Sequence, residues 1–103
     1  LIGKKEISLM KKDSYLINTA RGPLLDYKAL HDALSNGMLK GAALDTFYEE
    51  PLPKNHIFKN LNNVTITPHI AGASVKTAYY AAEVIAKDVR NYIDGKKLVN
   101  RIC

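Results

Sequence analysis

The chain has 103 residues, the length of one ordinary domain, and its composition of 47% hydrophobic and 24% charged residues is typical of a folded globular protein. The formal net charge is +5, but the lysines stand in small pairs far apart, without the interleaved aromatic residues that nucleic-acid binding needs. No apolar run approaches the roughly 20 residues that span a bilayer, so we expect neither a membrane nor a nucleic acid as partner.

In chain order, the first predicted elements are a short helix and a buried strand. Apolar residues among charges predict an amphipathic helix over 4–12, and the apolar run 15–18 predicts a strand. The next helix is punctuated at both ends. Asp26 is the expected N-cap, and Gly37 suits a left-handed cap at the carboxyl end.

The second half of the chain continues this alternation. Small apolar residues at 41–45 predict a second strand, and 64–67 predict a third. Between them, residues 46–63 are expected to form a long loop, which in a compact domain is usually functional or mobile. Apolar residues at three- and four-residue steps predict the longest helix over 74–94, ended by Gly95.

Strands joined through helices predict an α/β fold with a doubly wound parallel sheet. Three strands are few for such a sheet, whose two faces must both be covered. The chain also begins at Leu1, without an initiator methionine, so we expect more chain upstream.

The single cysteine, Cys103, cannot form an internal disulfide, which predicts a reducing, cytoplasmic setting. The tail 98–102 is apolar enough to dock elsewhere.

The third strand ends in an unusual way. Pro68 stops it and holds the chain extended, which places His69 just beyond the strand end. A histidine in such a place is more often a structural residue than a functional one. Its neighbours at the other strand ends decide between the two interpretations.

In an open parallel sheet, ligands bind beyond the carboxyl ends of the strands. Arg21 follows the first strand, Asp45, Glu49 and Glu50 follow the second, and His69 follows the third. An arginine grips a carboxylate through two parallel hydrogen bonds, and a glutamate on one ring nitrogen fixes the tautomer of a histidine that acts as a general acid. These residue types predict a site for small anions with a carbonyl or hydroxyl beside the carboxylate.

The sequence gives little support for a role of the other histidines, for a zinc site or for a nucleophilic serine. We interpret His31 and His56 as structural, because neither stands at a strand end. The spacing of Cys and His gives no zinc pattern, so no metal is predicted. No serine stands in a Gly-x-Ser-x-Gly turn.

Three stretches together resemble the NAD-dependent D-isomer-specific 2-hydroxyacid dehydrogenases. They are 16–22, 41–53 and 63–70, and they cover nearly the whole chain in the family's order. The continuation 70–72 is similar to the phosphoglycerate dehydrogenase-like members. The resemblance implies an oxidoreductase that transfers hydride between NAD(H) and a small 2-hydroxy or 2-oxo acid, with NADP also open as the cofactor.

The resemblance also assigns roles. It implies that Arg21 binds the substrate carboxylate, that Glu50 orients His69, and that His69 donates the proton. Glu49 is only the neighbour of the family position. The cofactor contacts that the resemblance implies, mostly through the backbone, are Thr19, Ala20, Arg21, Asp45, His69, Ile70, Ala71 and Gly72.

The chain departs from the family pattern in a few places. Thr46 stands where the family more often has valine, and Ile57 stands where proline usually follows His56. The family's Gly-x-Gly-x-x-Gly turn is absent. The resemblance therefore implies the carboxy-terminal portion of the enzyme: 1–73 as the second half of a Rossmann-like NAD-binding domain, and 74–103 as a long helix and tail that return to the substrate domain. We expect this piece alone to be inactive, and the full-length protein to be a homodimer.

Two other classes stay open at this point. Relatives on the same fold can keep the catalytic residues while sensing a dinucleotide as corepressors, and reduction of 2-oxo acids by NADH would argue against that class. The piece could also serve as an assembly module, because its exposed faces would seek partners.

Overall fold

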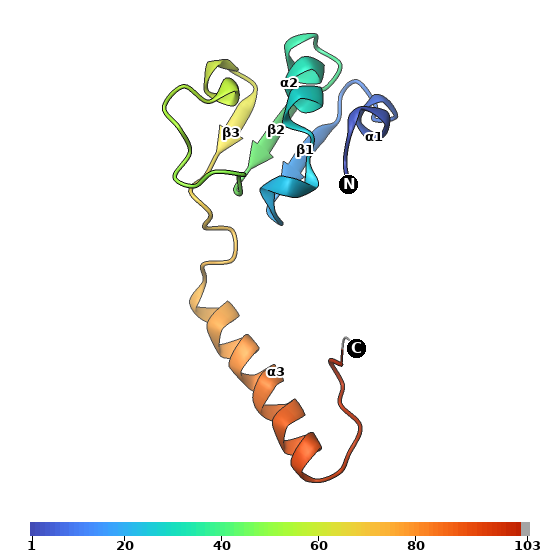
Figure 1. The fold of residues 1–103 in the computed structure, drawn as a ribbon, viewed down its shortest axis with the longest axis vertical. Coiled ribbons are helices and arrows are strands. Elements are labelled where there is room, and N and C mark those ends of the chain that lie inside the picture. The colour runs from blue at the N-terminus through green and yellow to red at the C-terminus, as the bar shows by residue number, and fades with distance from the viewer. Residues whose placement is uncertain (102–103) are drawn as a thin grey trace. The chain divides into compact units, whose positions relative to one another are not determined.

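The computed structural model describes residues 1–101. Position 102 of the predicted tail, and Cys103, on which the expectation of a reducing setting rests, lie outside them. The chain separates into two compact units, 1–71 and 72–103, which are described one at a time (Figure 1).

The first unit is built on a parallel sheet of three strands in the order β1-β2-β3. Its elements are α1 (Lys4–Ser8), β1 (Tyr15–Asn18), η1 (Gly22–Leu24), α2 (Tyr27–Ser35), β2 (Gly41–Leu44), η2 (Ile57–Asn60) and β3 (Val64–Ile66). Asn18 pairs with Leu44, which pairs with Ile66, so the three strands end at one level. The carboxyl ends of the strands therefore meet at one edge of the sheet (Figure 1).

The predicted parallel α/β sheet and its three strands are confirmed. The caps of α2 are also as expected: Asp26 accepts a hydrogen bond from the amide of Ala29, and Gly37 has φ of 66°. The first helix is shorter than predicted, because it ends at Ser8 rather than at 12. Only Ile7 of that helix is buried and Leu9 is 78% exposed, whereas Met10, beyond the helix end, is partly buried against the core.

The segment 46–63 is more ordered than the predicted loop. Phe47 and Phe58 are both buried in the core, and the 3₁₀ helix η2 lies around Phe58. Burial of two aromatic side chains, each of which contributes roughly 1.5–3 kcal/mol, fixes this segment although it has little regular hydrogen bonding.

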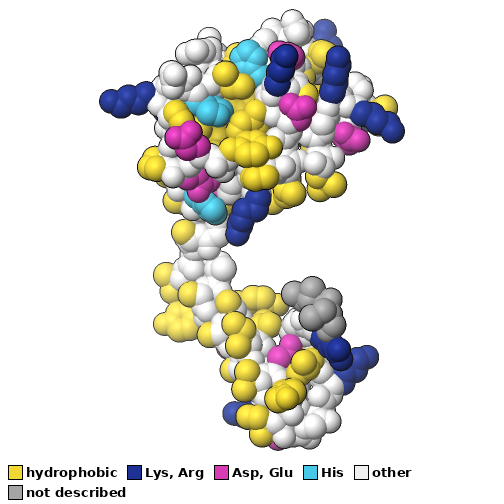
Figure 2. Space-filling view, in the orientation of Figure 1, with side chains coloured by type: hydrophobic (Ala, Val, Ile, Leu, Met, Phe, Trp, Pro, Cys, Tyr) yellow, Lys and Arg dark blue, Asp and Glu magenta, His cyan; other side chains and the backbone are white. Residues whose placement is uncertain are grey.

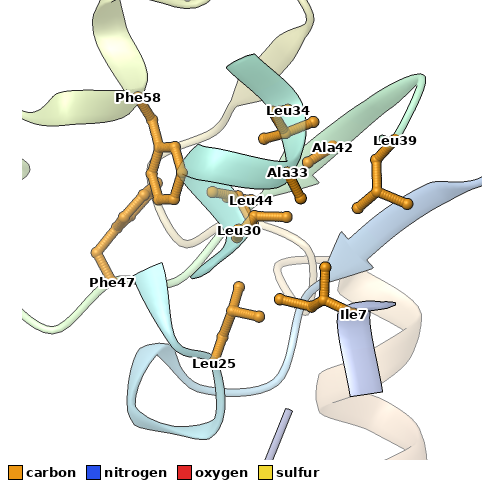
Figure 3. Packing of buried hydrophobic residues seen from close by; sticks show 10 residues of the cluster. All are labelled: Ile7, Leu25, Leu30, Ala33, Leu34, Leu39, Ala42, Leu44, Phe47 and Phe58. Carbon is orange, nitrogen blue, oxygen red and sulfur yellow. The ribbon is translucent and has the colours of Figure 1, made fainter. Parts of the chain in front are cut away.

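One apolar core holds the first unit together. Leu30, Ala33 and Leu34 of α2 face Leu44 of β2, with Phe58 packed beside them (Figure 3). The sheet face away from this core is different. Ile17 on β1 is 71% exposed, so only one face of the sheet is covered within this unit.

The second unit consists of α3 (Val75–Ile93) and the segment that follows it. Ser74 caps the helix by accepting a hydrogen bond from the amide of Thr77, and Gly95 follows the end with φ of 66°, as predicted. Asp88 accepts hydrogen bonds from the amides of Val99 and Asn100, each at 2.9 Å, which ties the tail to the helix. These bonds hold the pKa of the Asp88 carboxyl below its ordinary value.

No residue of α3 is buried, although its apolar residues form a stripe. The large exposed ones are Val75, Tyr79, Tyr80, Ile85, Val89, Tyr92 and Ile93. No helix within residues 1–101 is both long and apolar enough to cross a membrane. Packing of this helix on a substrate domain stays a prediction.

Candidate active site

The turn after β1 is shaped by Asn18, whose side chain bonds to the backbone ahead of it. Its Oδ1 accepts a hydrogen bond from the amide of Ala20 at 3.0 Å, and its Nδ2 donates to the carbonyl of Arg21 at 3.2 Å. This is the local bonding that makes asparagine a turn residue. Sequence reasoning missed Asn18, although an asparagine at the end of an apolar strand is a usable signal.

Arg21 is exposed at this turn, and its Nη1 donates to the carbonyl of Ala20 at 2.6 Å. The next residue, Gly22, is buried against the segment that follows β2. A methyl carbon on Gly22 would lie 2.3 Å from the carbonyl carbon of Phe47, which no side chain can tolerate. Glycine here brings the backbone that carries Arg21 against the segment that carries Glu50.

Glu50 and His69 form a direct pair. Oε2 of Glu50 lies 2.8 Å from Nδ1 of His69, and the two side chains are 37% and 45% exposed. The second carboxylate oxygen, Oε1, accepts a hydrogen bond from the amide of Phe47 at 2.8 Å. The bond with His69, and after it the amide of Phe47, holds the pKa of the Glu50 carboxyl below its ordinary value.

His69 has an unusual backbone conformation. Its φ is 55°, in the left-handed region that residues other than glycine seldom adopt. Its amide donates a hydrogen bond to the carbonyl of Asp45 at 2.9 Å, which anchors it to the end of β2. Such conformations persist only where the surroundings impose them, and they gather at functional sites.

The surroundings that impose it centre on Asp45, which is only 3% exposed. Its carboxylate accepts hydrogen bonds from Oγ1 of Thr67 at 2.5 Å and from the amides of Ile70 and Ala71 at 2.8 and 2.9 Å. Thr67, followed by these two amides, holds the pKa of the Asp45 carboxyl below its ordinary value. Asp45 thus fastens both sides of His69, and its predicted contact with the cofactor stays a prediction.

A cleft of about 410 Å³ opens beside the pair. Half of its lining residues are polar, namely Asp45, Glu50, Lys59, Thr67 and His69, and the other half are apolar. On the face shown in Figure 2, the Lys and Arg side chains of the first unit (dark blue) are scattered rather than gathered into one patch.

The predicted cofactor contacts fall on both sides of this edge. Thr19, Ala20 and Arg21 are exposed after β1, and Ile70 and Ala71 are exposed after β3. Ala20 and Ala71 have small side chains, and contact of these residues with the cofactor stays a prediction. Gly72 belongs to the second unit, and the structure does not join it to this group.

The other two histidines lie away from the pair, and their structural role stays a prediction. Nδ1 of His56 accepts a hydrogen bond from the amide of Phe58 at 3.4 Å, and its ring packs against three aromatic rings. Burial lowers the pKa of His56, and nearby Lys59 lowers it further. His31 lies on α2 at 3.8 Å from Asp32. Within the part of the chain that the structure describes, no three His, Cys, Asp or Glu side chains could together hold a metal ion.

Comparison with known proteins gives a consistent answer. Residues 1–71 match the family described as D-isomer specific 2-hydroxyacid dehydrogenase, NAD binding domain. The chain is 44% identical to a glyoxylate reductase of Thermofilum pendens and covers 31% of that protein with 98% of its own length. It is also 44% identical to a D-3-phosphoglycerate dehydrogenase of Methanocaldococcus jannaschii, with 97% of the chain on 19% of that protein.

Solved structures agree. A D-isomer specific 2-hydroxyacid dehydrogenase from Xanthobacter autotrophicus, in complex with NADPH and MES, superposes with a TM-score of 0.81 at 32% identity. That match covers 97% of this chain and 40% of the other. The chain belongs to the D-isomer specific 2-hydroxyacid dehydrogenase family, and its first unit is a portion of the family's Rossmann-like NAD-binding domain.

Proposed function

We propose that this chain is part of an NAD-dependent dehydrogenase that interconverts a small 2-oxo acid and the matching 2-hydroxy acid. The observation that carries the proposal is the 2.8 Å contact between Glu50 and His69 at the carboxyl edge of the sheet, beside an open cleft. The relatives named above are reductases and dehydrogenases, which favours this activity over a corepressor that only senses a dinucleotide.

In this proposal, His69 holds the proton that the carbonyl oxygen of the substrate receives. Glu50 accepts from Nδ1, which fixes the orientation of the ring and leaves Nε2 as the nitrogen that exchanges the proton with substrate. In the oxidative direction the same nitrogen accepts the proton from the hydroxyl group. The same pair therefore serves both directions of the reaction.

Arg21 is the proposed anchor for the substrate carboxylate. Arg21 is an exposed residue, and a guanidinium can grip two oxygens at once, whereas a lysine would offer one point charge. The close approach of Gly22 to Phe47 fixes the backbone of Arg21 relative to the segment that carries Glu50. Substrate binding and proton transfer are thus tied to one rigid edge.

The cofactor contacts proposed for this chain are those of Thr19, Ala20, Arg21, Asp45, His69, Ile70, Ala71 and Gly72. NAD supplies the hydride acceptor or donor when it is bound. The exposed backbone after β1 and after β3 fits such a ring, because small side chains there leave room for close approach. Asp45 would act mainly by holding the loop that carries His69 and the residues after it, since its oxygens already accept three hydrogen bonds.

Several broader features are proposals about the complete enzyme. The chain spans 31% of the Thermofilum glyoxylate reductase, so the substrate, partners and remaining cofactor contacts of the complete enzyme depend on more than these residues. Glyoxylate and hydroxypyruvate, which would be reduced, and phosphoglycerate, which would be oxidised with NAD, are the substrates to test first. The unburied apolar stripe of α3 supports its docking on a substrate domain. A homodimer and a cytoplasmic location stay predictions.

The test is reduction of a panel of 2-oxo acids with NADH and with NADPH by the complete enzyme that contains this chain. His69→Ala should lower kcat by about 10²–10⁴-fold, the usual contribution of a positioned acid. Arg21→Lys should mainly raise KM, because the two-point grip is lost. His31→Gln, a histidine change on α2, is the matched control and should leave turnover unchanged. Full turnover by His69→Ala would reject the mechanism.

A further inference from the structure

Tyr27, the first residue of α2, lies beside the segment that connects β2 to Glu50. Its hydroxyl donates a hydrogen bond to the carbonyl oxygen of Thr46 at 3.4 Å. The same hydroxyl oxygen accepts a hydrogen bond from the amide of Tyr48 at 3.1 Å. One side chain therefore holds two backbone groups that flank Phe47.

These contacts reach the active-site pair through one peptide group. The carbonyl of Thr46 and the amide of Phe47 belong to the same planar peptide, so holding the oxygen sets the direction of the N–H. That N–H donates to Oε1 of Glu50 at 2.8 Å. The other carboxylate oxygen of Glu50 contacts His69 at 2.8 Å. The sequence of contacts from Tyr27 to His69 is short.

The ring of Tyr27 is itself well held. It packs edge-on against Tyr48 at 4.8 Å, Phe58 at 5.3 Å and Phe47 at 6.2 Å between ring centroids. Such aromatic pairs fix the ring plane, and with it the direction of the hydroxyl. Burial raises the pKa of the Tyr27 hydroxyl, so it keeps the proton that it donates to Thr46.

We propose that Tyr27 is a positioning residue that orients Glu50, and through it His69, by holding the Thr46–Phe47 peptide. The inference rests on the proposed function, because orientation of the pair matters only if His69 transfers a proton. The hydrogen bonds of the Tyr27 hydroxyl go to backbone groups and not to the pair, so the proposed action runs through the backbone.

Tyr27→Phe removes the hydroxyl and keeps the ring among its aromatic neighbours. In the complete enzyme, kcat should fall about five- to tenfold with little change in KM, the size of effect expected for one hydrogen bond. The amide of Phe47 loses its fixed direction, so it stabilises the ionised carboxylate less well. The acid limb of the kcat/KM profile should therefore move to higher pH.

A second readout does not depend on activity. Hydrogen exchange at the amide of Phe47 should become about tenfold faster in Tyr27→Phe, because the peptide that carries it is no longer held. Tyr15→Phe is the matched control: Tyr15 lies on β1 with 59% of its surface exposed, and loss of its hydroxyl should change neither readout.

Two results would overturn the inference. One is an unchanged acid limb together with unchanged exchange at Phe47, and the other is an equal change in Tyr15→Phe. If the unaltered enzyme reduces no 2-oxo acid with either cofactor, the proposed function fails instead. Exchange at Phe47 would still decide whether Tyr27 holds the peptide, so the two failures are distinguishable.

Discussion

Gly22 and Phe47 lie so close that a methyl carbon on Gly22 would be 2.3 Å from the carbonyl carbon of Phe47. Gly22 follows the strand β1, and Phe47 follows β2, so the contact joins the ends of neighbouring strands. It is a backbone contact, and backbone cannot rotate aside as a flexible side chain can. Because Gly22 has no side chain, the turn after β1 and the segment after β2 can lie at this short distance.

Gly22→Ala should destabilise the protein by about 1–3 kcal/mol, the usual range for overpacking, and should also reduce turnover. The added methyl group must push the segment of Phe47 away and displace Glu50 with it. Urea denaturation and kcat/KM measure the two effects. Gly3→Ala is the control, because its methyl group would meet only the end of the Glu6 side chain at 3.5 Å. Equal stability of the two variants would contradict the expected clash.

Thr46 has a buried hydroxyl group without a hydrogen-bond partner. The residue is 1% exposed, and its Oγ1 is the one buried side-chain nitrogen or oxygen without a partner among residues 1–101. A buried hydroxyl without a partner costs roughly 1–3 kcal/mol. Thr46→Val should therefore raise the free energy of unfolding by about 1 kcal/mol. Thr65→Val, an exposed change on β3, should leave it within about 0.5 kcal/mol. Destabilisation by Thr46→Val would show that the hydroxyl has a partner.

His56 predicts a pH dependence of stability. Burial lowers the pKa of His56 from 6.5 in the folded protein, so the unfolded chain binds the proton more readily. The contribution of His56 is therefore fully present above pH 6.5 and is lost as the pH falls below it. In His56→Asn, which keeps a capping acceptor for η2, the fall in melting temperature below pH 6.5 should be smaller. The other histidines are present in both proteins and cancel in the comparison. An identical fall in both proteins would contradict the assignment to His56.

The parts that sequence predicted well are those with local signals. Alternation of short apolar runs with capped helices located the strands β1 to β3, and Asp26 and Ser74 stand at the helix starts as expected. A parallel sheet places Glu50 and His69 at the same edge. In the structure the contact of His69 is with Glu50 and not with Glu49. The resemblance, and not spacing, supplied the choice between the two glutamates.

The parts that sequence missed depend on contacts between distant segments. The hydroxyl of Tyr27 bonds to residues about 20 positions away, and nothing in the pattern of α2 indicates it. The sequence identifies Thr67 only as the last residue of a predicted strand, whereas in the structure its hydroxyl donates a hydrogen bond to the buried carboxylate of Asp45. The sequence predicts only a long loop over 46–63, and neither Phe47 nor Phe58 has a periodic partner that would signal its burial. These contacts follow from the packed structure and not from local pattern.

We expect Glu50 to serve catalysis only through His69, and a double-mutant cycle on kcat/KM measures whether it does. Glu50→Gln should lower kcat/KM substantially, and His69→Ala should lower it by about 10²–10⁴-fold. The double variant should then be no worse than His69→Ala alone, because Glu50 has nothing left to orient. If the two losses instead multiply, Glu50 acts independently of His69, and the 2.8 Å contact does not explain its role.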